Sequence, residues 1–92
     1  MIDSKILKQD VKRLINQLWK LIPMRENEED WKAQLDNVTI EIRGLQEITS
    51  LDFLILISKL EGLRNSEIDF HTYRRTVFKI IELLCEVTNY NE

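Results

Sequence analysis

The chain has 92 residues, 43% of them hydrophobic, and a net charge of −3, which excludes global disorder and fits one domain with a modest core. The mildly acidic charge offers no general attraction to nucleic acid or to an anionic membrane surface. The single cysteine, Cys85, excludes an intramolecular disulfide, and the N-terminus lacks an apolar signal segment. We therefore expect a cytoplasmic protein with a single helical domain over residues 1–92.

The first predicted helix spans about residues 4–22. Asp3 or Ser4 can cap its start, and Pro23 is expected to end it because the residue before a proline is disfavoured in a helix. Apolar residues recur along it at the short steps typical of a buried helix face: Leu7, Val11, Leu14, Ile15, Leu18 and Ile22.

The second predicted helix spans about residues 28–43, with Asn27 as its cap and Gly44 as its end. Its apolar residues alternate steps of four and three, which indicates a seam that packs on another helix: Trp31, Leu35, Val38, Ile42 and Leu45. Residues 38–42 also alternate between apolar and polar side chains, as a strand does. The longer pattern favours a helix, and a strand stays open as the alternative.

The most apolar stretch is Leu51–Leu60, which predicts a third helix over about residues 50–61 with Thr49 as its cap and Gly62 as its end. A membrane span needs about 20 apolar residues, so this shorter run is excluded as one. Its apolar side chains surround nearly the whole helix. Such a helix is either central in its domain or shared with another chain.

The fourth predicted helix spans about residues 70–87, with Asp69 as its cap. One apolar face runs along it: Phe70, Tyr73, Val77, Ile80, Ile81, Leu84 and Val87. Short connections between helices favour antiparallel neighbours. The sequence therefore predicts an all-α fold, a four-helix antiparallel bundle that oligomerisation could complete.

Four residues of the central stretch are the predicted partner-binding site: Phe53, Leu56, Ile57 and Leu60. A monomeric bundle has one interior, so a helix that is apolar on opposite sides is expected to leave an apolar face for a partner. This predicts a non-enzymatic protein-interaction or assembly module that binds itself, as a homo-oligomer, or a larger protein. His71 and Cys85 lie too far apart along one helix to share a metal, so we expect no metal and no cofactor.

One alternative is an enzyme. Arg64 and Asn65 followed by His71, in RNSEIDFH, resemble the Arg…His motif of HEPN-family ribonucleases, which are also helical. The resemblance implies a dimer that brings paired Arg64 and His71 side chains together to cleave RNA. The chain is short for that family, and here the motif spans a predicted loop and helix cap.

A second alternative is a nucleic-acid-binding regulator. It would use basic residues of the first and last helices: Lys8, Lys12, Arg74 and Arg75. The acidic net charge and the absence of a recognisable reading motif disfavour nucleic acid as the partner.

Overall fold

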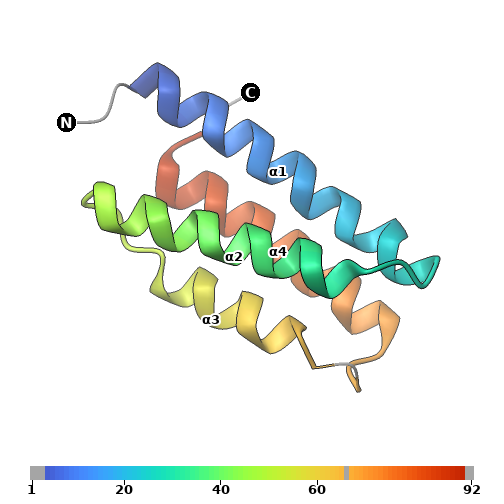
Figure 1. Ribbon diagram of the computed structural model, residues 1–92. Coiled ribbons are helices and arrows are strands. Elements are labelled where there is room, and N and C mark those ends of the chain that lie inside the picture. Colours follow the sequence, from blue (N-terminus) through green and yellow to red (C-terminus); the bar gives the residue numbers. More distant parts are fainter. Residues whose placement is uncertain (1–3, 66, 91–92) are drawn as a thin grey trace.

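Four helices alternate in direction along the chain, so each is antiparallel to the one before it (Figure 1). The computed structural model describes residues 4–65 and 67–90, with residues 4–7 described as backbone alone, and contains no strand in this part of the chain. The helices are α1 (Ser4–Glu26), α2 (Trp31–Ile48), α3 (Leu54–Leu63) and α4 (Phe70–Thr88). This confirms the predicted all-α antiparallel bundle.

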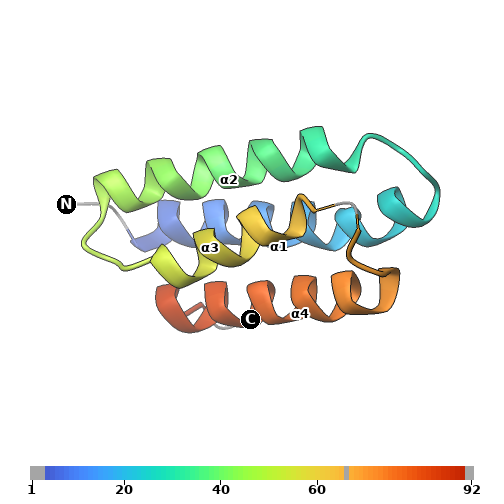
Figure 2. The ribbon, with the colours of Figure 1, turned by 90° about the horizontal axis from the view of Figure 1, so that it is seen from below.

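Each helix contacts two neighbours, and α4 closes the ring by packing against both α3 and α1. The four therefore sit at the corners of a square, with α2 diagonally opposite α4 (Figure 2). The bundle measures 40 × 22 × 20 Å. No helix in the described part of the chain is both long and apolar enough to cross a membrane.

The prediction that Pro23 ends the first helix is wrong, because α1 continues to Glu26. A proline removes one backbone N–H and crowds the carbonyl four residues before it, but its ring fixes φ near the helical value. Pro23 lies in the last turn, where its carbonyl still accepts from the backbone N–H of Asn27 at 2.9 Å. The proposed cap Asp3 lies outside the described residues, as does the side chain of Ser4.

The predicted ends of the second helix are also wrong. Asp30 is the cap, and its carboxylate accepts from the N–H of Ala33 at 3.2 Å. Glu28 has a φ of 58°, which keeps the connection before Asp30 out of the helix. The helix then runs through Gly44 to Ile48, so residues 38–42 are helical.

The third helix begins at Leu54 rather than residue 50, and it includes Gly62. The Thr49 hydroxyl accepts from the Leu51 N–H at 3.2 Å and donates to the Leu45 carbonyl at 2.7 Å, so it holds the turn after α2 and does not cap α3. The carboxylate of Asp52 accepts from the Leu54 N–H at 3.0 Å.

The predicted cap of the last helix is confirmed. The Asp69 carboxylate accepts from the backbone N–H and the hydroxyl of Thr72, both at 2.9 Å. At the other end, Asn89 adopts a left-handed conformation with φ 54°, and its N–H donates to the carbonyls of Cys85 and Glu86.

The core lies along the axis of the bundle, and among the described residues it holds no buried charged side chain. Burying its aliphatic surface is the main stabilising contribution, at about 25 cal/mol per Å². Every helix supplies members: Val11, Leu14, Leu18 and Leu21 from α1; Leu35, Val38, Ile42 and Leu45 from α2; Leu56, Ile57, Leu60 and Leu63 from α3, with Phe53 before it; Tyr73, Val77, Ile80 and Leu84 from α4.

Candidate protein-binding surface

The helix α2 has a second regular face besides the one that it buries. Besides the charged Arg43 and Glu47, its exposed residues are five uncharged ones that follow helical spacing: Ala33, Asn37, Ile40, Gly44 and Ile48. We call this set the outer ridge of α2. Because a helix normally presents charged and polar residues to water, an uncharged ridge opposite the core is unusual for a monomer.

Among the residues whose side chains the structure describes, four large aliphatic ones are exposed, and these belong to α2 and α3. They are Ile40 at 66%, Ile48 at 64%, Leu54 at 62% and Ile55 at 69% of full exposure. The other large exposed apolar residue is Trp19 on α1, at 46%. Exposed apolar residues of this size hint at a surface for a protein partner.

Two grooves show how these side chains are arranged. Ile48 lines the groove between α1 and α2, and Leu54 lines the groove between α2 and α3. Glu47 contributes to both grooves. Ile48 and Leu54 therefore line neighbouring grooves that meet at Glu47.

Ion pairs flank the outer ridge. Arg13 on α1 binds Glu41 at 3.0 Å, and Arg43 binds Glu61 on α3. Exposed pairs of this kind add little stability. Their consequence here is that Glu41 and Arg43 beside the ridge are neutralised by neighbouring helices, whereas Glu47 has no ion pair among the described residues.

A third pair, between α2 and the end of α3, is bidentate. The Nε and Nη2 atoms of Arg64 each lie 2.6 Å from a carboxylate oxygen of Asp36. This hydrogen bonding lowers the pKa of Asp36 and raises that of Arg64. The guanidinium that the ribonuclease alternative requires is thus bound to a carboxylate. His71 is exposed in the first turn of α4, and no contact joins it to Arg64 in the described part of the chain.

The four residues predicted to bind a partner are in the core. Phe53 and Leu60 are fully buried, and Leu56 and Ile57 nearly so. The reason is that α3 is short and lies between α2 and α4, so its wide apolar arc contacts both neighbours. That these four contact a partner stays a prediction, and it would require the bundle to open. The exposed residues of the same stretch are Leu54 and Ile55.

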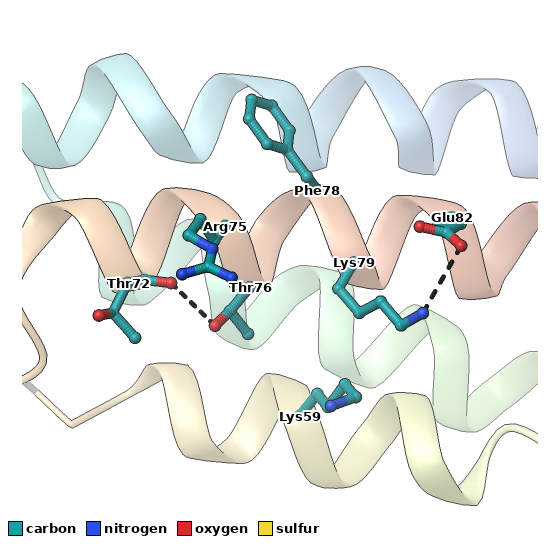
Figure 3. A pocket seen from close by; sticks show the side chains of 7 residues that line it. All are labelled: Lys59, Thr72, Arg75, Thr76, Phe78, Lys79 and Glu82. Atoms are coloured by element: carbon teal, nitrogen blue, oxygen red, sulfur yellow. Dashed lines mark hydrogen bonds and ion pairs between the residues drawn. The ribbon is translucent and has the colours of Figure 1, made fainter.

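A basic groove runs between α3 and α4 (Figure 3). Lys59 faces it from α3, and Arg75 and Lys79 face it from α4. Lys79 pairs with Glu82 at 3.5 Å, whereas Lys59 and Arg75 have no ion pair among the described residues. The groove is therefore open to an acidic group.

The other three basic residues of the nucleic-acid alternative, Arg74, Lys8 and Lys12, do not line this groove. Arg74 lies over the ring of Phe78 at 5.2 Å, and Phe78 in turn meets Trp19 of α1 at 5.1 Å. Lys8 and Lys12 lie on α1, diagonally opposite α3. The four basic residues of the nucleic-acid alternative are thus not gathered into one stripe.

The described residues contain no group of three His, Cys, Asp or Glu side chains placed to hold a metal ion. Searches against protein-family models, curated proteins and solved structures find no match to this chain. The surface itself must therefore carry the functional argument.

The exposed Ile40 and Ile48 of the outer ridge are not among the residues that the sequence predicts to bind a partner. Each is four residues from Gly44, so a regular spacing on the outer face of the helix is the signal that the sequence carries for them.

Proposed function

We propose that this chain is a non-enzymatic protein-interaction module. It binds a protein partner through the aliphatic surface formed by Ile40, Ile48, Leu54 and Ile55. The observation that carries the proposal is that all four side chains are more than 60% exposed and all lie on α2 and α3.

The charge distribution supports the same side of the bundle. The centre of a protein interface is depleted of charged residues. The outer ridge has none. Three charged residues of α2 and α3 are exposed beside it, Arg43, Glu47 and Glu61, whereas α4 exposes five: Arg74, Arg75, Lys79, Glu82 and Glu86. A partner that covers α2 and α3 therefore displaces water from aliphatic carbon without stripping water from many charges.

The test is affinity capture with the full chain, followed by identification of the retained proteins. The variant carries Ile40→Ser, Ile48→Ser, Leu54→Ser and Ile55→Ser, and its matched control carries Lys12→Ser and Lys20→Ser on α1. We expect a stoichiometric partner, either another copy or a different protein, that the control retains and the variant loses. A folded variant that keeps every partner of the wild-type chain would contradict the proposal.

The basic groove favours a second candidate, the binding of an acidic partner between α3 and α4. Lys59 and Arg75 would hold it, since neither is neutralised by an ion pair among the described residues. Binding of a single-stranded oligonucleotide or an acidic peptide would then weaken steeply with salt. It would also be lost in Lys59→Glu with Arg75→Glu. Binding that ignores salt would exclude this candidate.

The ribonuclease alternative predicts RNA cleavage by the wild-type chain that both Arg64→Ala and His71→Ala abolish. Our proposal predicts no cleavage by any of the three proteins. Arg64→Ala is expected to remain folded because the Arg64–Asp36 pair is exposed.

A further inference from the structure

We infer that the partner is a second copy of this chain, bound with α2 antiparallel to the partner's α2 about a two-fold axis at Gly44. This inference rests on the proposed function and names the occupant of part of the same surface. The helix is free for such a contact, because α2 is a corner of the bundle whose outer ridge faces solvent (Figure 2).

The second half of the outer ridge, Ile40, Gly44 and Ile48, is complementary to its own reverse. Ile40 and Ile48 stand at equal distances before and after Gly44. In an antiparallel pair with the axis at Gly44, Ile40 of one copy comes opposite Ile48 of the other, twice. A closed two-fold dimer requires such a self-complementary surface, whereas a different partner would not require it.

Gly44 is also unexplained within one copy. Glycine weakens the interior of a helix relative to alanine. The backbone of Gly44 is helical without a positive φ, and an added Cβ would meet nothing within 4 Å. Neither the conformation nor the packing of the monomer needs a glycine there. At a two-fold axis, it lets the two α2 backbones approach closely.

The charges beside the ridge are compatible with the same axis. Arg43 and Glu47 both line the groove on the α3 side, one turn apart. The axis brings Glu47 of each copy level with Glu41 of the other, whose charge Arg13 neutralises, and within two residues of the level of Arg43. Glu47 has no ion pair within the described part of the chain, so Arg43 would be shared between Glu61 of its own copy and Glu47 of the second.

Disulfide trapping tests the axis. In a Cys85→Ala background, Gly44→Cys is expected to form an intermolecular disulfide rapidly under mild oxidation, because the two Cα atoms must lie within about 7 Å for this bond. Gly62→Cys in the same background is the matched control. It too replaces an exposed helical glycine with open space around it, but on α3. Equal crosslinking of the two variants would overturn the geometry.

Mass measurement by light scattering over a range of concentrations tests the dimer itself. We expect a wild-type dimer whose dissociation constant rises about tenfold or more in Ile40→Glu, in Ile48→Glu and in Gly44→Ala, but not in Gly62→Ala. A wild-type chain that stays monomeric at every concentration overturns the inference. If that monomer still captures another protein through the aliphatic surface, the proposed function stands; if it captures none, both fail.

Discussion

Tyr73 is the single phenol in the buried core of the described chain, and its environment favours the neutral form. Its hydroxyl donates to the Leu21 carbonyl at 3.2 Å, and its ring lies under the guanidinium of Arg25 at 4.5 Å. Tyr73→Phe removes the hydroxyl, so the Leu21 carbonyl loses this hydrogen bond. We expect a loss of about 0.5–1.5 kcal/mol in the free energy of unfolding, measured by urea denaturation at pH 7. An unchanged midpoint would mean that water replaces the hydroxyl.

Tyr73 also predicts how stability changes at alkaline pH. Burial raises the pKa of Tyr73 to about 12, against the nearby positive charge of Arg25, which lowers it. In the unfolded chain Tyr73 loses its proton near pH 10. The contribution of the neutral phenol to the free energy of unfolding is therefore complete below pH 10 and is lost as the pH rises toward 12. We expect wild type to lose about 2–3 kcal/mol more than Tyr73→Phe over this interval. If the free energy of unfolding fell equally with pH in wild type and Tyr73→Phe, the raised pKa of Tyr73 would be contradicted.

At the scale of the element, the cap of α4 can be tested by charge. Hydrogen bonds from Thr72 lower the pKa of Asp69. The charged carboxylate of Asp69 therefore stabilises the fold at pH values above the pKa that Asp69 has in the unfolded chain. This stabilisation is lost as the pH falls through the lower pKa that Asp69 has in the folded chain. We expect Asp69→Ala to lower the melting temperature at pH 7. Asp69→Asn, which keeps an acceptor oxygen, should melt close to wild type and lose less stability in acid.

The inner seams of the helices could be read from the sequence, but their ends could not. Leu35, Val38, Ile42 and Leu45 are buried as their spacing predicted, because the repeat of a helix face fixes which side chains share it. Several nearby residues can cap the same helix, and the sequence does not show which of them does. Here the left-handed conformation of Glu28 interrupts the helix after Asn27, so that Asp30 caps it. A proline or glycine near a helix end is tolerated when the surrounding helices already hold the backbone.

At the scale of the whole molecule, the central stretch was recognised as the most apolar, but its orientation could not be derived. Periodicity places side chains around a helix axis without saying which neighbours they meet. Because α3 packs against both α2 and α4, it buries the predicted Leu56 and exposes Leu54. The exposed part of the surface therefore depended on the packing of other helices.

The contrast between these two leucines is directly measurable. Leu56→Ala creates a cavity in the core and is expected to cost about 2–5 kcal/mol in unfolding free energy. Leu54→Ala removes an exposed side chain, and at protein concentrations where the chain is monomeric we expect a change within about 0.5 kcal/mol. Denaturant titrations of both variants measure these two changes in the free energy of unfolding. Equal losses would place Leu54 inside the folded unit.

Thermal unfolding links the stability of the bundle to its assembly. When two folded copies associate and the unfolded chains do not, association stabilises the folded state by mass action, so the melting temperature rises with protein concentration. We expect this rise for the wild-type chain and its absence in Ile40→Glu, whose side chain is exposed and leaves the core unchanged. Extrapolated to low concentration, the two melting temperatures should converge, because the variant removes only the contact between copies. A constant offset at all concentrations would instead locate the effect of Ile40 within the single bundle.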